Sequence, residues 1–142
     1  MAIRQLSVFV ENKPGALVDI VAALAQAKID IRAMSVADTN DFGILRLIVS
    51  DVEATKEVLS AGYLYNVTDV VAVEMKDESG ALSGILNVLG AAQINLEYMY
   101  AFTAPTAHGA YVVLRVADNE AAQEALTAAG FVLLSDNDAK VF

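Results

Sequence analysis

Two stretches of this 142-residue sequence are nearly the same: PGALVDIVAALAQAKIDI at residues 14–31 and SGALSGILNVLGAAQINL at residues 79–96. They lie 65 positions apart, and at that offset Gly15 matches Gly80 and Leu24 matches Leu89. Self-similarity at one fixed offset over such a length indicates an internal duplication. We therefore predict two domains of about 70 residues, 1–69 and 70–142, which pack together because so small a unit is only marginally stable alone.

The first unit is predicted to begin with a strand at 3–10, where β-branched and apolar residues predominate. Residues 11–15 (Glu-Asn-Lys-Pro-Gly) break the strand, and a helix follows because proline or glycine suits a first helical turn. Apolar residues recur in this helix at i, i+3, i+4 and i+7, namely Leu17, Ile20, Val21 and Leu24. This spacing predicts one apolar stripe packed against a sheet in a helix that ends near Lys28.

Two further strands are predicted at 29–36 and 43–49, joined by a turn at 37–41 into a hairpin. Ser50 and Glu53 fit the capping box, in which each side chain satisfies a free backbone amide at a helix start. The second helix then runs through Leu59 and stops at Gly62, and a last strand lies within 63–75.

The order strand, helix, strand, strand, helix, strand repeats in the second unit, with helices near 80–92 and 119–129 and strands near 94–102 and 110–116. With right-handed crossovers, this order gives a four-stranded antiparallel sheet with both helices on one face. The predicted fold class is therefore α+β, with two ferredoxin-like βαββαβ units paired side by side. Residues 70–73 could close the first unit, open the second, or belong to one strand that runs through both.

The charge and composition exclude several classes of partner. The formal net charge is −9, so a nucleic acid or an anionic membrane surface would be repelled rather than bound. The chain has no cysteine, its start lacks the apolar run of a signal peptide, and no apolar stretch reaches the roughly 20 residues of a membrane helix. We therefore expect a cytoplasmic protein. Hydrophobic residues make up 56% of the chain, above the ordinary share of about 45–50%, and this surplus predicts extra buried surface between the two units or between subunits, the latter in a homodimer.

Residues 11–17 (Glu-Asn-Lys-Pro-Gly-Ala-Leu), placed between the first strand and the first helix, resemble the ACT domain, a small regulatory module that usually binds an amino acid. Both units look like ACT domains, so the resemblance covers nearly the whole chain. It implies a non-catalytic regulatory protein that binds a small amino acid at an interface between ACT domains and signals to a metabolic enzyme or to its own assembly. We expect no catalytic residue, no cofactor and no metal.

The loop at 11–15 is itself suited to a carboxylate. A helix start offers unpaired amides and the positive end of the helix dipole, and Gly15 lets a ligand approach the backbone closely. Asn12 adds an amide that can both donate and accept hydrogen bonds. The alternative interpretation is a plain strand-to-helix turn. The candidate ligand-binding residues are Asn12, Lys13, Pro14, Gly15, Ala16 and Leu17, to which the resemblance adds Asn95 and Asp30.

In ACT domains, the ligand commonly sits between this loop of one domain and the start of the second strand of another. Asp30 and Asn95 are candidates because they stand at that strand start in the first and the second unit. If the two units of one chain pair, Asn12 faces Asn95, and the second loop, with Asp77, faces Asp30. Two carboxylates would repel the carboxylate of a ligand, so this pairing predicts one competent and one degenerate site. If two chains pair identical units, Asn12 faces Asp30 instead.

Two other functions are weighed against amino-acid sensing. Residues 77–83 also resemble the corresponding stretch of the regulatory subunit of acetohydroxyacid synthase, so a dedicated regulatory subunit of an amino-acid biosynthetic enzyme is the alternative. An acylphosphatase-type enzyme would need an arginine in its phosphate-binding loop, whereas the two loops offer only Lys13 and Lys76. The expected partners are a free amino acid, a second copy of the chain and an amino-acid metabolic enzyme.

Aromatic residues and a histidine complete the candidate groups. Tyr98, Tyr100 and Phe102 alternate along one predicted strand and share one face, so they could line a side-chain pocket, although packing is the more common role of such a stripe. His108 is the only histidine, and it falls in a surface loop without companions for a transition-metal site.

Overall fold

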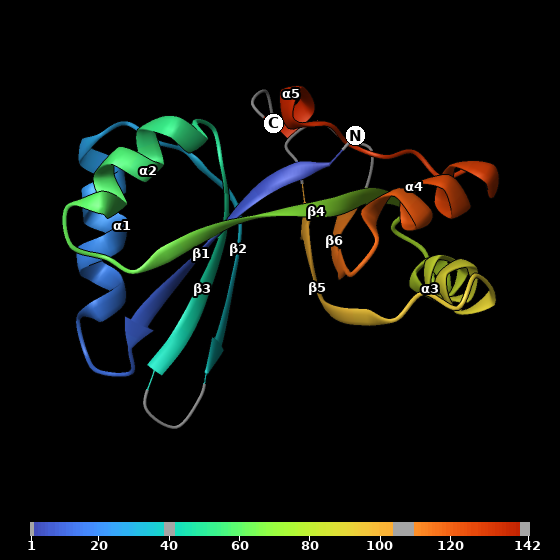
Figure 1. Ribbon diagram of the computed structural model, residues 1–142, viewed down its shortest axis with the longest axis horizontal. Coiled ribbons are helices and arrows are strands. Elements are labelled where there is room, and N and C mark those ends of the chain that lie inside the picture. Colours follow the sequence, from blue (N-terminus) through green and yellow to red (C-terminus); the bar gives the residue numbers. More distant parts are fainter. Residues whose placement is uncertain (1, 39–41, 104–109, 140–142) are drawn as a thin grey trace. The chain divides into compact units, whose positions relative to one another are not determined.

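The computed structural model describes residues 2–38, 42–103 and 110–139 (Figure 1). The elements in chain order are β1 (Ile3–Glu11), α1 (Ala16–Gln26), β2 (Ile31–Asp38), β3 (Phe42–Val49), α2 (Val52–Ser60), β4 (Tyr65–Met75), α3 (Ala81–Ala91), β5 (Leu96–Thr103), β6 (Ala110–Val116), α4 (Asn119–Ala128) and α5 (Asp136–Ala139). The predicted turn at 37–41 lies partly outside the described residues, and His108 lies wholly outside them.

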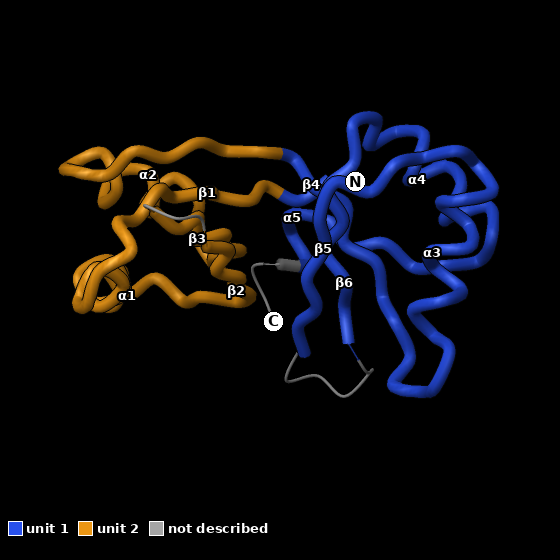
Figure 2. Tube along the Cα trace, turned by 90° about the horizontal axis from the view of Figure 1, so that it is seen from below, with its two compact units in different colours: residues 1–3, 69–140, 142 blue, residues 4–68, 141 orange. Residues whose placement is uncertain are grey.

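The chain divides into two compact units, shown in different colours in Figure 2. The N-terminal unit comprises residues 4–68 (orange), and the C-terminal unit comprises residues 2–3 and 69–139 (blue). The strand β4 is continuous and gives residues 65–68 to the first of these and residues 69–75 to the second. Of the three alternatives for residues 70–73, the structure therefore shows the strand that runs through both units.

In the N-terminal unit the strands follow the order β2-β3-β1-β4, and β1 and β2 both pair antiparallel with β3. Alternate residues of a strand face the same side of the sheet, and in Figure 1 both α1 and α2 lie on one side of these strands. The core between the sheet and the helices is formed mainly by Leu6, Val8, Val10, Ile20, Leu24, Leu45, Leu47, Val49 and Leu59. This is the predicted ferredoxin-like arrangement.

The apolar stripe predicted for α1 is only half buried. Ile20 and Leu24 are fully buried, whereas Leu17 and Val21 keep 40% and 41% of their surface exposed. Successive helical residues are rotated by about 100°, which places Val21 at the edge of the stripe, whereas Leu17 lies within about 20° of Leu24 around the helix but in the exposed first turn of α1. The prediction that these residues pack against the sheet is confirmed for Ile20 and Leu24 and wrong for Leu17 and Val21.

In the C-terminal unit the strands follow the order β4-β6-β5, with antiparallel pairing of β6 to both neighbours. The fourth strand of this unit is reduced to a single antiparallel bridge between Leu133 and Val73. Its core repeats that of the other unit and contains Val71, Val73, Ile85, Leu89, Val112, Leu114, Val116, Ala122, Leu126 and Leu133.

The capping box predicted at the start of α2 was wrong. Asp51, rather than Ser50, is the N-cap residue, and its carboxylate accepts a hydrogen bond from the Ala54 amide at 3.0 Å. The Ser50 hydroxyl instead accepts a hydrogen bond from the backbone amide of Asp30 at 3.0 Å. The Ser50 side chain therefore forms a tertiary hydrogen bond in place of the helix cap that the local pattern predicts.

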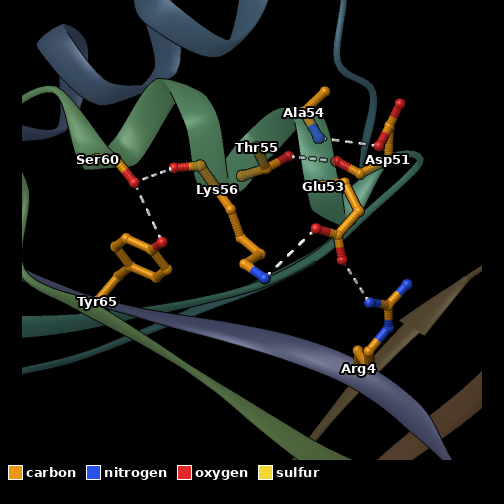
Figure 3. A network of polar contacts seen from close by, with 8 residues as sticks. All are labelled: Arg4, Asp51, Glu53, Ala54, Thr55, Lys56, Ser60 and Tyr65. Atoms are coloured by element: carbon orange, nitrogen blue, oxygen red, sulfur yellow. Dashed lines mark hydrogen bonds and ion pairs between the residues drawn. The ribbon is translucent and has the colours of Figure 1, made fainter.

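Glu53, the other member of the predicted box, belongs to a polar network on the N-terminal unit (Figure 3). It accepts a hydrogen bond from Arg4 of β1 at 2.9 Å and another from Lys56 at 3.4 Å. The hydrogen bond from Arg4, followed by that from Lys56, holds the pKa of the Glu53 carboxyl below its ordinary value. The network thus joins α2 to β1 through a charged side chain.

Candidate functional site

The loops that lead from the first strand of each unit into its first helix share one backbone arrangement. In the loop at 11–15, the Lys13 amide donates to the Glu11 carbonyl at 2.9 Å. The same bond recurs 65 residues later, where the Glu78 amide donates to the Lys76 carbonyl at 2.9 Å. The duplication therefore extends to the hydrogen bonding of the candidate site.

Both loops end in a glycine with a left-handed backbone. Gly15 has φ 86° and Gly80 has φ 88°, values that residues with a side chain rarely adopt. These glycines are the N-cap residues of α1 and α3, and neither helix has a side-chain cap for its first amides. The first turn of each helix therefore keeps the amides and the dipole end that favour a bound anion.

A pocket lies beside each of these loops. The pocket of the N-terminal unit has a volume of about 240 Å³ and is lined by Phe9, Val10, Glu11, Lys13, Ala16, Asp19, Gly62, Tyr63 and Leu64. The pocket of the C-terminal unit has a volume of about 480 Å³ and is lined by Glu74, Met75, Lys76, Glu78, Ser79, Gly80, Ala81, Gly84, Ala129, Gly130, Phe131 and Val132. Each pocket is built from residues of one unit alone.

The two pockets occupy equivalent positions in the duplicated fold. On the helix side, Ala16 corresponds to Ala81, and Asp19 corresponds to Gly84. The opposite wall is the turn that follows the second helix of each unit.

That opposite wall repeats as well. The Tyr63 amide donates to the Leu59 carbonyl at 2.9 Å, and the Phe131 amide donates to the Leu126 carbonyl at 3.0 Å. The Phe9 amide is bonded to the Leu64 carbonyl at 2.9 Å, which ties this turn to the first strand. In each unit the pocket therefore lies between the entry to the first helix and the exit from the second.

The charged residues beside the two pockets are arranged differently. In the N-terminal unit, the Lys13 ammonium lies 3.0 Å from the Glu11 carboxylate, with 62% and 73% of these side chains exposed. Such an exposed pair contributes about 1 kcal/mol or less. In the C-terminal unit the charges are exchanged, with Lys76 and Glu78 in these places, and neither forms an ion pair with another described residue.

Of the predicted ligand-binding residues, Lys13 and Ala16 line the pocket of the N-terminal unit. The remaining residues of that loop and helix start are exposed and line neither of the two pockets: Asn12, Pro14, Gly15 and Leu17. The structure therefore brings only part of the predicted set to a cavity.

Asp30 and Asn95 also lie outside both pockets. The Asp30 carboxylate is 3.5 Å from the Arg32 guanidinium, and its backbone amide is bonded to Ser50. Asn95 is exposed and belongs to the other unit. The pairing of Asn12 with either residue stays a prediction.

Sequence reasoning missed the wall contributed by the turns at 62–64 and 129–132, because no local pattern connects a turn with a loop some 50 residues away in the chain. It also missed Gly84, for which a signal existed. A glycine inside a helix is costly, and here it stands where the first copy of the repeat has Asp19.

The aromatic stripe on β5 lines neither of these pockets. Tyr98, Tyr100 and Phe102 are half-buried, and the Phe102 ring stacks on Tyr111 of β6 with centroids 5.3 Å apart. Burial, followed by the nearby carboxylate of Glu74, raises the pKa of Tyr111. This surrounding favours the packing interpretation of the stripe over the pocket interpretation.

No helix within residues 2–38, 42–103 and 110–139 combines the length and the apolar character needed to cross a membrane. No group of three or more His, Cys, Asp or Glu residues in these ranges could hold a metal ion.

Known proteins resemble this chain over nearly its whole length. Protein BT0572 from Bacteroides thetaiotaomicron, known from a crystal structure, is 36% identical, with 100% of this chain and 98% of that chain covered and a TM-score of 0.92. The ligand-free regulatory subunit of aspartate kinase from Thermus thermophilus is 15% identical, with 89% and 91% covered and a TM-score of 0.63. The regulatory subunit from Thermus flavus is 16% identical, with 89% and 91% covered and a TM-score of 0.54.

The two aspartate kinase subunits share the fold alone at this level of identity. No curated protein matches the chain. The model of one family, described as the ACT domain pair, matches residues 1–141. With the duplicated ferredoxin-like units and the glycine-ended loop before each first helix, this match shows that the chain belongs to the ACT domain pair family.

Proposed function

We propose that this protein is a non-catalytic regulator that binds an α-amino acid beside the first helix of an ACT domain and passes its occupancy to a metabolic enzyme or to its own assembly. The observation that supports this function is the repeated arrangement of loop and pocket in the two units. A left-handed glycine, uncapped helix amides and a cavity coincide in both. A plain strand-to-helix turn would require neither the uncapped amides nor the cavity.

An amino acid carries the charges that this arrangement can recognise. Its carboxylate suits the amides at the start of α1 or α3, and its ammonium suits a carboxylate or an amide oxygen. The binding residues proposed in the first loop are those at 12–17, together with Asn95 or Asp30 from a paired ACT domain. Asn12 would bond the charged groups of the ligand, and the neighbouring cavity would receive its side chain.

Signalling then requires no more than thermodynamic linkage. An amino acid that bridges two ACT domains stabilises their paired form by the difference between its affinities for the paired and unpaired states. The paired form could be a homodimer or a complex with an enzyme. Sedimentation of the protein with and without the amino acid would measure the first, and co-purification would identify the second.

The first experiment is thermal unfolding of the full chain against each of the twenty amino acids at millimolar concentration. A ligand present at about 100 times its dissociation constant adds roughly 2.7 kcal/mol to native stability, which should raise the midpoint by several degrees. One responder, or a few related ones, would establish binding and name the ligand class. An unchanged midpoint with every one of the twenty amino acids would contradict the proposed function.

Variants of the loop test where the ligand binds. If the first loop holds it, Asn12→Ala and Gly15→Val should lose the ligand-induced rise in midpoint, whereas Asn87→Ala, on an exposed position of α3, should keep it. The comparison is made within each variant, with and without ligand, because Gly15→Val itself strains the backbone. An undiminished rise in both loop variants would remove the first loop from the site.

The alternative function, a regulatory subunit of acetohydroxyacid synthase or of another amino-acid biosynthetic enzyme, predicts a stable complex. Tagged full-length protein purified from its own cells would then retain one enzyme in fixed proportion. A ligand response without any retained enzyme would favour the free-standing sensor.

A further inference from the structure

We infer that the pocket of the C-terminal unit is the one that receives the ligand, and that it selects an amino acid with an apolar side chain. This inference rests on the proposed function and reverses the expectation that the first loop is the competent one. It follows from a difference between two otherwise equivalent cavities.

The difference is first one of volume. Ligand pockets usually enclose about 300–1,000 Å³. The pocket of the C-terminal unit, at about 480 Å³, falls within this range, whereas that of the N-terminal unit, at about 240 Å³, falls below it. The pocket of the C-terminal unit therefore offers a free amino acid about twice the space that the pocket of the N-terminal unit offers.

The volume difference coincides with one substitution between the repeats. Asp19 and Gly84 occupy the same helical position, since the amide of each donates to the carbonyl of the preceding loop glycine, at 3.2 and 3.1 Å. Both residues line their pockets. The first cavity is thus lined at this position by an exposed aspartate, whereas the second is lined by a residue without a side chain.

The wall around Gly84 is apolar. A Cβ placed on Gly84 would stand 3.7 Å from the Phe131 ring, so this ring faces the space that the absent side chain leaves. Met75 and Ala81 add further apolar surface. In the N-terminal unit the aromatic position carries a hydroxyl, as Tyr63, and the helical position carries a charge, as Asp19. An apolar side chain is therefore favoured beside Gly84 and opposed beside Asp19.

The charged end of an amino acid also has partners here. Lys76 and Glu78 line the cavity and form no ion pair with another described residue, so an ammonium and a carboxylate are available to the two ends of a zwitterion. Ser79 stands where the first loop has Pro14, and it adds a backbone N–H and a hydroxyl that proline lacks. The ligand class assigned to this site is thus a free α-amino acid with an aliphatic or aromatic side chain.

The test is isothermal titration calorimetry of the full chain with L-leucine, L-valine and L-phenylalanine as probes and L-serine and L-aspartate as polar comparisons. Gly84→Asp gives the C-terminal unit the residue that the N-terminal unit has at this helical position. Asn87→Asp, on an exposed position of the same helix, is the control because it introduces the same carboxylate away from the cavity. Circular dichroism of both variants verifies that they fold.

We expect at least one apolar probe to bind the unmodified protein, with a dissociation constant about tenfold or more higher in Gly84→Asp and changed less than about twofold in Asn87→Asp. Gly84→Ala, which places a methyl group at ordinary contact distance from Phe131, should weaken the larger probes and should fold at least as well as the parent.

Other outcomes overturn the inference. If an apolar probe binds Gly84→Asp unchanged but is lost in Asn12→Ala, the first loop is the site and the proposed function survives without this inference. Preference for L-serine or L-aspartate over the apolar probes would refute the assigned ligand class alone. If none of the twenty amino acids binds the unmodified protein, the proposed function fails together with the inference.

Discussion

A Cβ atom on Gly84 would meet the Cζ atom of Phe131 at 3.7 Å, and no other described atom would lie within 4 Å of it, apart from the two neighbouring residues and the helix's own backbone. This is an ordinary van der Waals contact, so a methyl group fits between α3 and the segment that follows α4. The glycine is therefore not required by close packing. Its effect is to leave open the wall of the larger pocket.

Gly84→Ala should raise the free energy of unfolding by about 0.5–1 kcal/mol, because alanine is the better helix former and the added methyl meets no clash. Gly90→Ala is the matched change, since Gly90 lies in the same helix with open space around it. Urea unfolding of both variants measures the gain. A loss of stability in Gly84→Ala alone would mean that the contact with Phe131 is tighter than described.

Gly15→Ala and Gly80→Ala should each destabilise the protein by about 1–2 kcal/mol, although neither site lacks room for a methyl group. The cost arises from the backbone, because φ is 86° at Gly15 and 88° at Gly80. Gly62→Ala is the control, as its surroundings are equally open and its φ is not positive. Chemical denaturation should leave Gly62→Ala within about 0.5 kcal/mol of the parent, and equal costs at all three positions would contradict the backbone explanation.

The caps of the second helices give a third prediction. Asp51 accepts a hydrogen bond from the Ala54 amide at 3.0 Å, and Asp118 accepts one from the Ala121 amide at 3.1 Å. Replacing either aspartate with alanine should cost about 0.5–2 kcal/mol, whereas asparagine should retain most of the stability. Thermal unfolding of the four single variants provides the measurement. Equal losses for alanine and asparagine would show that charge, rather than the hydrogen bond, is the main contribution.

The Glu53 network predicts a pH dependence. Arg4 lowers the pKa of the Glu53 carboxyl in the folded protein, so the network stabilises the fold above the unfolded pKa and this stabilisation is lost as pH falls through the folded pKa. In Arg4→Met and in Lys56→Met, the pKa of Glu53 should rise toward its ordinary value. Carbon NMR of the side-chain carboxyl during an acid titration measures both. An unchanged titration in Arg4→Met would rule out the described hydrogen bond as the cause.

The local periodicities of the sequence predicted the first four helices and six of the strands, but not the loss of the last strand of the second unit, which is reduced to the bridge between Leu133 and Val73. The helix from Ala16 to Gln26 and the strand from Ala110 to Val116 form where the spacing of apolar residues and the turn residues predict them, because these signals act over neighbouring positions. The prediction of the α2 cap was wrong because the same local signals do not include tertiary contacts. Ser50 has an equally good local role, and only its distance from the Asp30 amide in the folded unit decides which role it takes.

The features of the candidate site also fall into those that the sequence predicts and those that depend on the tertiary structure. The sequence by itself determined the duplication, the two glycine-ended loops and the family to which the chain belongs, since each is a pattern of residue types along the chain. Only the tertiary structure decided that the turn with Phe131 forms the second wall of a pocket, and that Gly84 faces it. A cavity is a property of surfaces that approach from distant parts of the chain, and the absence of one side chain matters only where such a surface stands opposite.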